Sequence, residues 1–339
     1  MPDSVARVIH AGSKMTLPEV LAMLHADLEH VEDRLASIER PDVPLTAEIM
    51  EHVLARRGKR VRPLLLMLVA RLGEKADWDK VLWAGTVIEL VHTATLVHDD
   101  CLDGTRLRRG TPTVNHRYGE HAAILMGDYL FTTGFELLRA HGLPEALAVL
   151  TRQTHRMTCG MNREYAARHD AALTPEAYYR IIGEKTGTLF ESSCEIGANL
   201  AGMPPGSVER MVEFGRELGL AFQIIDDVFD FAGDPDAIGK PVGTDFRLGF
   251  ATLPLIESLR NGDPDRGRRV AEIFARGDVT DEEWEECRAF VLTGGGVEAA
   301  RERAMEHAFA ARDRLAFLNG SPGVAPLLAT VEFMIDRGR

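Results

Sequence analysis

Cysteine is scarce in this sequence of 339 residues, which contains only four. They stand far apart and form no C-x-x-C pair: Cys101, Cys159, Cys194 and Cys287. This spacing argues against the dense disulfide framework of a small secreted domain. Scattered single cysteines are instead typical of reduced thiols in a cytoplasmic protein.

A basic excess is also missing. Lys and Arg together number 39 against 52 Asp and Glu, which gives a formal net charge of −13. A nucleic-acid-binding protein would show a basic surface, so this balance argues against a nucleic acid as partner. An anionic small molecule remains compatible with it, because a local basic cluster can override the net charge.

No long apolar run is present. The longest, Pro63 to Ala70, is far shorter than the roughly 20 residues that span a bilayer. An early Arg and Lys near the N-terminus are not followed by the apolar segment of a signal peptide. We therefore expect a soluble, cytoplasmic protein without an integral membrane segment.

Strand-like alternation is rare, and helical periodicity of apolar residues dominates the chain. Helices are expected over residues 17–35, 45–55, 64–72, 78–102, 122–140, 144–170, 175–200 and 207–231, and over much of 251–339. A loop rich in Gly, Pro and Asp is expected at 232–248. No Pro/Ser-rich linker or composition shift divides the chain. We expect one all-α domain over 1–339, with 1–15 as a flexible N-terminal extension.

Two aspartate clusters of the form D-D-x-x-D lie in apolar helical segments, at Asp99–Asp103 and Asp226–Asp230. Residues four apart share a helix face, so the first and last Asp of each cluster project together. Like charges at that spacing repel each other and are costly to desolvate, and a divalent cation relieves both effects. Carboxylate ligation favours Mg²⁺ or Mn²⁺ over zinc, and Mg²⁺ sites of this kind commonly include substrate phosphates.

Basic residues that could bind a polyphosphate occur near both clusters. Gly58–Pro63 places Lys and Arg at an expected helix start, which suits an anion. Arg108 and Arg109 follow the first cluster, Lys185 interrupts an apolar helix, and Lys240 follows the second cluster. Their placement around the clusters favours the binding of a second polyphosphate.

Each of these features also has a purely structural interpretation. A single aspartate cluster is equally well a solvated or helix-capping run, and an isolated Lys or Arg is commonly an exposed charge. We interpret Arg60 as an exposed charge of this kind. His92 lies two helical turns before Asp99, so it either packs in the core or donates to a diphosphate oxygen.

Taken in order, these motifs resemble those of the trans-isoprenyl diphosphate synthases, and most closely the long-chain octaprenyl and heptaprenyl types. The resemblance extends from Gly58 to Pro254, through Gly58–Pro63, His92–Asp103, Arg108–Gly110, Lys185–Thr186, Phe222–Asp230 and Gly239–Pro241. It implies an antiparallel helical bundle around a large central cavity, and a homodimer. It also implies a prenyltransferase that condenses an allylic diphosphate with isopentenyl diphosphate and releases diphosphate.

The resemblance further implies roles for individual residues. Three Mg²⁺ ions, with Mn²⁺ as a substitute, would be bound by Asp99, Asp103 and Asp226, with Asp230 and Asp227 in support. The allylic diphosphate would be held by Arg108, Lys185 and Lys240. Isopentenyl diphosphate would be held by Gly58, Lys59, Arg62, His92 and Arg109. The oxygens of Thr186 and Gln223 would face the developing carbocation.

This assignment fits the chemistry that the family carries out. As the allylic C–O bond ionises, the metal ions and the Lys and Arg side chains stabilise the departing diphosphate. Apolar walls keep water from the cation, and the released diphosphate would remove the final proton. Two positions depart from the family pattern, because Met161 stands where Glu or Gln is usual and Phe250 where Lys is common.

Small residues just before Asp99 favour a long product. At about 1.5 Å per residue, Ala94 and Thr95 lie roughly 6–8 Å from Asp99 along the helix. In short-chain relatives an aromatic residue commonly blocks this level. Further positions that limit product length would lie on the same helix and on the opposite wall of the cavity. The residues on that wall could equally be ordinary core residues. The expected chain-length residues are Ala94, Thr95, Val91, Met126 and Phe131.

Three other functions are alternatives to a long-chain synthase. A geranylgeranyl or farnesyl diphosphate synthase would differ only in product length. A class I terpene cyclase normally has an Asn/Ser/Glu-type second metal motif, unlike Asp226–Asp230. A non-catalytic subunit of a heteromeric synthase tends to lose the aspartates or the basic residues, which are all present here.

Overall fold

A computed structural model describes residues 15–55, 58–74, 76–108, 110–233, 242–318 and 320–336. Helices form nearly all of the regular structure in these residues, which confirms the all-α prediction. The exception among them is a short antiparallel hairpin of β1 (Leu107–Arg108) and β2 (Thr111–Pro112). The extension expected at residues 1–15 lies almost wholly outside the described residues.

Two compact units divide the chain, and both are assembled from segments distant in sequence. The first unit holds residues 1–153, 189–213 and 315–330, and the second holds residues 154–188, 214–314 and 331–339. The boundaries between them fall within long helices as well as near helix ends. The single domain expected over the whole chain stays a prediction.

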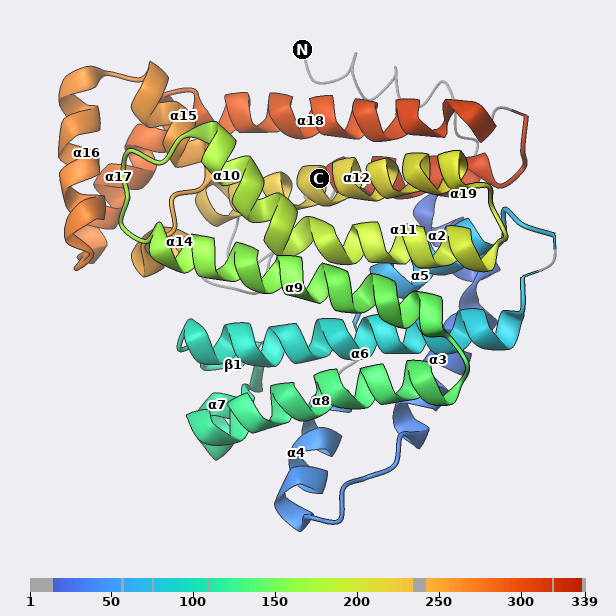
Figure 1. Ribbon diagram of the computed structural model, residues 1–339. Helices are drawn as coiled ribbons and strands as arrows, with labels where there is room; N and C mark the ends of the chain where they lie inside the picture. The colour runs from blue at the N-terminus through green and yellow to red at the C-terminus, as the bar shows by residue number, and fades with distance from the viewer. Residues whose placement is uncertain are drawn as a thin grey trace. The chain divides into compact units, whose positions relative to one another are not determined.

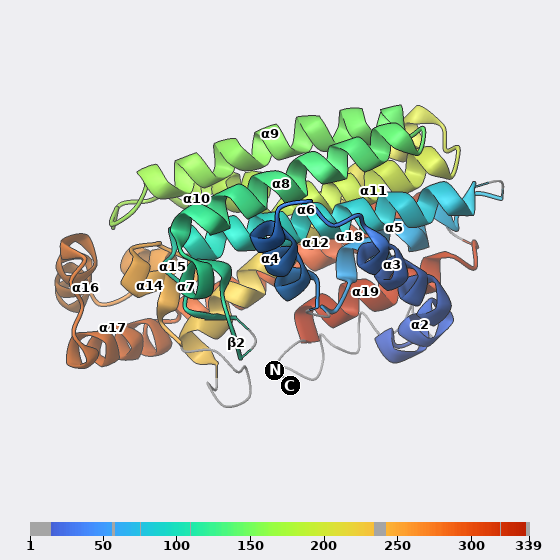
Figure 2. The ribbon, with the colours of Figure 1, turned by 90° about the horizontal axis from the view of Figure 1, so that it is seen from below.

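The first unit is organised around one long helix. Its elements are α2 (Leu17–Met23), α3 (His25–Ser37), α4 (Pro44–Leu54), α5 (Val61–Ala70), α6 (Trp78–Leu102), α7 (Val114–Tyr118), α8 (Glu120–Ala140), the first part of α9 (Pro144–Ala166), most of α11 (Thr188–Leu200), the first part of α12 (Pro205–Ala232), the 3-10 helix η2 (Leu315–Leu318) and the first part of α19 (Val324–Asp336). Helices α3, α5 and α8 pack against α6 (Figures 1 and 2).

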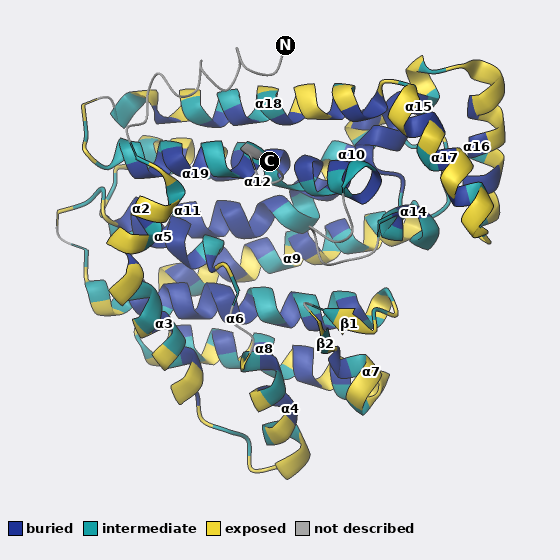
Figure 3. Cartoon of the chain, turned by 180° about the vertical axis from the view of Figure 1, so that it is seen from behind, coloured by how far each residue is buried: buried dark blue, intermediate teal, exposed yellow. Residues whose placement is uncertain are grey.

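Helix α6 begins and ends where the sequence predicts. The Asp77 side chain caps its first turn by accepting the Lys80 N–H, which satisfies a donor that the helix cannot pair internally. Buried residues cover much of its circumference (Figure 3), as expected of a core helix. Among the described residues it is also the one helix long and apolar enough to span a membrane, but 72% of that window is buried inside the protein.

The second unit contains the last part of α9, α10 (Pro175–Ile182), the π-helical turn η1 (Gly183–Gly187), the last part of α12, α14 (Thr244–Leu248), α15 (Leu253–Asn261), α16 (Pro264–Arg276), α17 (Asp281–Thr293), α18 (Gly296–Arg314) and the end of α19. Its core includes an aromatic cluster in which Phe246 contacts Phe231, Phe274 and Trp284. This cluster fixes the short helix α14 against α12, α16 and α17.

Three segments differ from the sequence prediction. The helix expected over 17–35 breaks at Leu24, which lies between α2 and α3. The helix expected over 175–200 contains the π-helical turn, and the loop expected over 232–248 contains α14. The period of apolar residues continues through the first two breaks, so periodicity alone gives no signal for them.

Candidate active site

The first aspartate cluster lies at the C-terminal end of α6, and its carboxylates differ in environment. Asp100 is buried and accepts from Arg108 Nε at 2.8 and 2.9 Å and from Arg108 Nη2 at 2.7 Å. Burial acts to lower the pKa of Arg108, but Asp100, together with Asp99 and Asp103, outweighs burial and the pKa is raised. Asp99 and Asp103 are only half-buried, with Asp103 at the helix C-cap. Arg108 therefore neutralises the middle carboxylate and leaves the outer pair nearer to solvent.

The donor set of this cluster fits a divalent cation that brings its own phosphate ligands. Within the described ranges, no group of three or more His, Cys, Asp or Glu side chains is placed to hold a metal ion. Asp99 and Asp103 instead offer two carboxylates one helical turn apart. Mg²⁺ accepts one or two carboxylates when substrate phosphates and water complete its coordination. The geometry suits that mode and does not form a closed, all-protein metal site.

Two of the predicted residues lie together where the start of α5 meets α6. Arg62 Nη1 lies 3.1 Å from His92 Nε2, and the Arg62 guanidinium lies 4.9 Å from the ring centroid of Phe190. Lys59 is exposed, and Gly58 is partly buried. Arg62 and His92 therefore form one local group on α5 and α6, and their binding of a common substrate stays a prediction.

Arg60 is buried, so its interpretation as an exposed charge is wrong. Its side chain is 8% exposed and lies 2.5 Å from both Glu32 Oε1 and Glu89 Oε1. Burial acts to lower its pKa, but the two carboxylates outweigh burial and the pKa is raised. Its backbone is left-handed, with φ of 50°, which is uncommon outside glycine. The partners come from α3 and α6, far away in sequence, so local patterns could not reveal them.

The second aspartate cluster also has a buried and hydrogen-bonded middle residue. Asp227 accepts from the Tyr178 hydroxyl and from Gln223 Nε2, each at 2.7 Å, and is 2% exposed. Burial raises the pKa of Asp227 well above its usual value and nearby Asp245 adds to this, while the two hydrogen bonds oppose it. Asp226, by contrast, is half-buried.

Asp230, the last residue of this cluster, supports the neighbouring backbone. Its two carboxylate oxygens accept the backbone N–H groups of Thr244 and Asp245, both at 3.1 Å. These groups begin α14, and a carboxylate stabilises the donors at the start of a helix. Asp230 is 1% exposed, so a supporting role beside Asp226 agrees with its surroundings.

The π-helical turn presents Lys185 and Thr186. The Thr186 hydroxyl donates to Gln223 Oε1 at 2.8 Å. Lys185 Nζ lies 2.5 Å from Glu164 Oε2 and 5.8 Å from the ring centroid of Phe250. Phe250, which replaces a common Lys, thus packs against the predicted substrate-binding Lys185. A π-helical turn adds a residue to the helix and commonly occurs at functional sites.

Helix α9 approaches this turn closely at Gly160. A Cβ atom at Gly160 would lie 2.6 Å from the backbone nitrogen of Lys185 and 2.7 Å from Glu184 Cβ. Real Cβ atoms essentially never come so close to backbone, so α9 can lie here only with glycine. Met161 follows, where the family usually has Glu or Gln, and the carboxylate that contacts Lys185 comes from Glu164, one turn further along α9.

Most of the expected chain-length residues lie in the packed region of α6 and α8. Val91 and Ala94 are fully buried, Thr95 is 7% exposed, and Met126 on α8 is 1% exposed. Phe131 is half-buried and stacks on His98, with ring centroids 5.9 Å apart. Two other predicted site residues, Arg109 and Lys240, lie outside the described residues.

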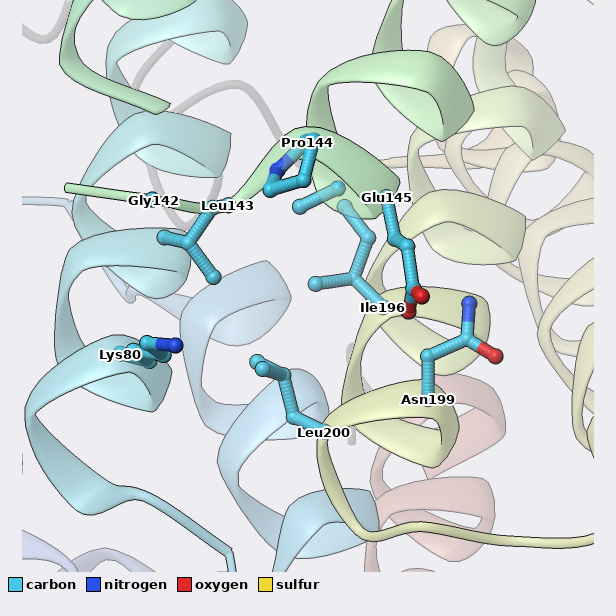
Figure 4. Close-up of a pocket in the computed structure, with 9 residues that line it drawn as sticks. Lys80, Gly142, Leu143, Pro144, Glu145, Ile196, Asn199 and Leu200 are labelled. Atoms are coloured by element: carbon cyan, nitrogen blue, oxygen red, sulfur yellow. The ribbon is translucent and has the colours of Figure 1, made fainter. Parts of the chain in front are cut away.

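A separate cavity of about 260 Å³ lies at the other end of α6 (Figure 4). Its lining is mixed, with apolar side chains beside the polar groups of Lys80, Glu145 and Asn199: Lys80, Gly142, Leu143, Pro144, Glu145, Ala146, Ile196, Asn199 and Leu200. Lys80 precedes Asp99 by about five helical turns, or roughly 28 Å along the helix. None of the sequence-predicted site residues that the structure describes lines it.

The sequence pattern described as "Polyprenyl synthetase" matches residues 43–291, a range that includes both aspartate clusters. The chain belongs to the polyprenyl synthetase family. Membership of this enzyme family confirms the predicted prenyltransferase class and the resemblance seen in the motifs. The chain is therefore a trans-prenyl diphosphate synthase.

Similar proteins in the polyprenyl synthetase family differ in the products for which they are named. The chain is 34% identical over 317 residues to the nonaprenyl diphosphate synthase of Mycobacterium tuberculosis, covering 93% of this chain and 94% of that protein. It is 37% identical over 270 residues to the short chain isoprenyl diphosphate synthase of Methanocaldococcus jannaschii, covering 77% and 80%.

A solved polyprenyl synthase also has a similar structure. It comes from Caulobacter crescentus CB15 and was crystallised with calcium and isoprenyl diphosphate. The TM-score is 0.91 at 31% identity, and the similarity covers 96% of this chain and 98% of that one. Divalent metal ions are thus a feature of the family.

Sequence reasoning missed two residues of the site. Tyr178 donates to Asp227, and Glu89 pairs with Arg60. Tyr178 precedes Lys185 by two helical turns, so its spacing from the Lys-Thr pair was an available signal. Glu89 stands in an apolar helix, and a carboxylate in such a helix needs a partner, but the sequence does not say which cation provides it.

Proposed function

We propose that the chain is a magnesium-dependent trans-prenyltransferase that condenses an allylic diphosphate with isopentenyl diphosphate to make a long-chain polyprenyl diphosphate. The observation that supports it best is that the middle and first aspartates differ in burial in the same way in both clusters. In each, the middle aspartate is buried and hydrogen-bonded by protein groups, while the first is half-buried. The first carboxylates lie nearer to solvent than the middle ones, in keeping with a role as metal ligands.

In this proposal the metal ligands are Asp99, Asp103 and Asp226, with Asp230 in support. Three Mg²⁺ ions, when bound with the allylic diphosphate, would supply positive charge to the departing diphosphate. Asp100, Asp227 and Asp230 would not ligate a metal ion directly, because protein groups already hydrogen-bond to both oxygens of each. Asp230 would instead support Asp226 by fixing the start of α14.

The cationic residues would bind the two diphosphates separately. Arg62 and His92 already form one group, and with Gly58, Lys59 and Arg109 they would hold isopentenyl diphosphate. Arg108, Lys185 and Lys240 would hold the allylic diphosphate. Lys185 would exchange its contact with Glu164 for a diphosphate oxygen, since a phosphate carries more charge than one carboxylate.

The oxygens of Thr186 and Gln223 would face the allylic carbon as its C–O bond ionises. A carbonyl or hydroxyl oxygen aimed at developing positive charge stabilises it without reorganisation. The released diphosphate would then take the proton from the condensed product, because it is the strongest base left at the site.

A single assay distinguishes this function from its alternatives. Diphosphate release is measured with an allylic diphosphate alone and then with isopentenyl diphosphate added. The proposal requires both substrates, a terpene cyclase would need only the allylic one, and a non-catalytic subunit would release none with either. Release from the allylic substrate alone, or no release at all, would refute the proposal.

Product length is tested by sizing the products made from farnesyl and isopentenyl diphosphates. The small side chains of Ala94 and Thr95 below Asp99 support a long chain. A product that ends at geranylgeranyl diphosphate would contradict that part of the proposal and leave the reaction class intact.

We also propose a homodimer, in keeping with four exposed apolar side chains in the first unit. They lie at the end of α6, on β1 and on the first turns of α8, and they are 49–68% exposed: Leu102, Leu107, Ile124 and Leu125. Burying them against a second copy would remove apolar surface from water. Sedimentation of a Leu125→Glu variant should show monomers, whereas Leu45→Glu, at a similarly exposed leucine of α4, should leave the dimer intact.

A further inference from the structure

We infer that Tyr178 is a positioning residue that acts through Asp227 and Gln223 to make Thr186 present only lone pairs to the reacting carbon. This inference rests on the proposed function, in which Thr186 faces the carbocation. It adds a residue outside the aspartate clusters and basic motifs to the residues that control the reaction.

Four side chains of the second unit form one chain of hydrogen bonds with a fixed direction. Tyr178 Oη donates to Asp227 Oδ2 at 2.7 Å, and Gln223 Nε2 donates to Asp227 Oδ1 at 2.7 Å. Gln223 Oε1 then accepts from Thr186 Oγ1 at 2.8 Å. Both carboxylate oxygens of Asp227 are therefore acceptors, and every proton in the chain points toward Asp227.

The direction of this chain follows from the chemistry of its members. An amide that turns its NH₂ group to a carboxylate must turn its carbonyl oxygen the other way. The hydroxyl of Thr186 has a single proton, and that proton is used by Gln223 Oε1. Toward any other neighbour, Thr186 can act only as an acceptor.

The two ends of the hydrogen-bond chain differ in burial, because the Tyr178 end is buried and the Thr186 end is partly exposed. Tyr178 and Asp227 are each 2% exposed, whereas Gln223 and Thr186 are half-buried. Helix α10, which carries Tyr178, leads directly into the π-helical turn that carries Thr186 (Figure 1). A change at the buried hydroxyl is therefore transmitted to Thr186 through the three hydrogen bonds that link the four side chains.

Loss of the Tyr178 hydroxyl would weaken this control. Asp227 could rotate, the Gln223 amide could turn over, and the Thr186 proton could point at the substrate. An O–H dipole aimed at a developing cation repels it, whereas a lone pair attracts it. Because removing one preorganised dipole costs about 10²–10³ in kcat when it contacts the reacting group directly, we expect about a tenfold loss for this indirect effect.

The test compares Tyr178→Phe with Tyr179→Phe. Each variant removes one hydroxyl from α10 and keeps the ring, but the Tyr179 hydroxyl makes no hydrogen bond within the described part of the chain. We expect Tyr178→Phe to lower kcat about tenfold with the KM for the allylic diphosphate unchanged, and Tyr179→Phe to match the wild type. In a Gln223→Leu background, Tyr178→Phe should cause no further loss. Wild-type kcat in Tyr178→Phe, or losses that multiply in the double variant, would overturn the inference.

Two further measurements keep the test decisive. Gln223→Leu removes both Oε1 and the donor to Asp227, so it should lose kcat at least to a similar extent even if Tyr178→Phe fails to fold. The side-chain amide signals of Gln223 in ¹⁵N NMR should change in Tyr178→Phe and not in Tyr179→Phe. This measurement needs no substrate. An unchanged amide signal in Tyr178→Phe refutes the inference about Tyr178 but not the proposed function. A wild-type protein that releases no diphosphate with both substrates refutes the proposed function.

Discussion

Arg60 Nη1 lies 2.5 Å from Glu89 Oε1, and both side chains are less than one-tenth exposed. Arg60 also contacts Glu32, so one guanidinium joins α3 and α6 at the start of α5. Glu89 precedes His92 by three residues on α6, and Arg62 follows Arg60 by two on α5. The buried pair therefore holds the start of α5 against the middle of α6, where Arg62 and His92 meet.

Removing Arg60 should destabilise the protein strongly. Arg60→Ala leaves Glu89 buried without its cation, and breaking a buried pair in this way costs about 3–5 kcal/mol. Arg71→Ala is the matched control, because Arg71 pairs with Asp27 at 2.5 Å but is 41% exposed, and such pairs contribute up to about 1 kcal/mol. Urea denaturation measures both. Equal losses in the two variants would contradict the buried role of Arg60.

Asp99 should be required for turnover and dispensable for folding. Asp99→Ala removes a proposed metal ligand, and we expect kcat to fall about 100-fold or more, since the metal would stabilise charge on the leaving diphosphate. Asp79→Ala, at an exposed position in the first turn of α6, should keep near-native activity. Steady-state kinetics and thermal melting test both variants. Near-native turnover in Asp99→Ala would refute the metal assignment.

Ala94 should influence how far the product grows. Ala94→Phe places a large side chain at a fully buried position of α6, and we expect products shorter than those of the wild type. The insertion should also cost about 1–3 kcal/mol of stability through overpacking. Ala94→Ser keeps a small side chain and should leave the product distribution unchanged. Chromatographic sizing of the products decides, and an unchanged length in Ala94→Phe would remove Ala94 from the chain-length residues.

Alkaline pH should weaken the second unit through Cys287. Burial raises the pKa of this thiol from 9.0 to about 12, with Glu286 and Glu283 adding to the effect. Between pH 9 and pH 12 the unfolded chain is ionised at this position while the folded chain is not, so unfolding releases a proton. The free energy of unfolding should therefore fall as pH rises across that window, by at most about 1.4 kcal/mol per pH unit.

Cys287→Ser provides the control for this pH dependence, because a serine hydroxyl does not ionise in the same range. Urea midpoints measured from pH 8 to pH 11 should fall more steeply for the wild type than for the variant. Parallel curves would show that Cys287 does not titrate as its burial indicates.

Features fixed by neighbouring residues could be predicted from the sequence. The helix over Trp78–Leu102 agrees with the structure because its cap at Asp77 and its apolar content are local properties. The grouping of Arg62 with His92 followed from the motifs of the family, and the structure places the two side chains 3.1 Å apart.

Features that depend on distant partners could not be predicted. Tyr178 and Asp227 are 49 residues apart, and nothing in either segment indicates that they share a hydrogen bond. The burial of Arg60 depends on two carboxylate partners that lie on other helices, so its own segment predicts an exposed charge. The π-helical turn leaves the apolar period almost unchanged, so it appears only in the backbone.

Gly160 has a consequence for how this protein can change over generations. Alanine is the commonest harmless replacement in a helix, yet here its methyl group would meet the backbone nitrogen of Lys185 at 2.6 Å. An obstructing side chain could adapt through a second substitution, but a backbone atom cannot. Substitutions at this position are therefore not tolerated one at a time. The absence of a Cβ atom at Gly160 allows α9 to pack against the turn that carries Lys185 and Thr186.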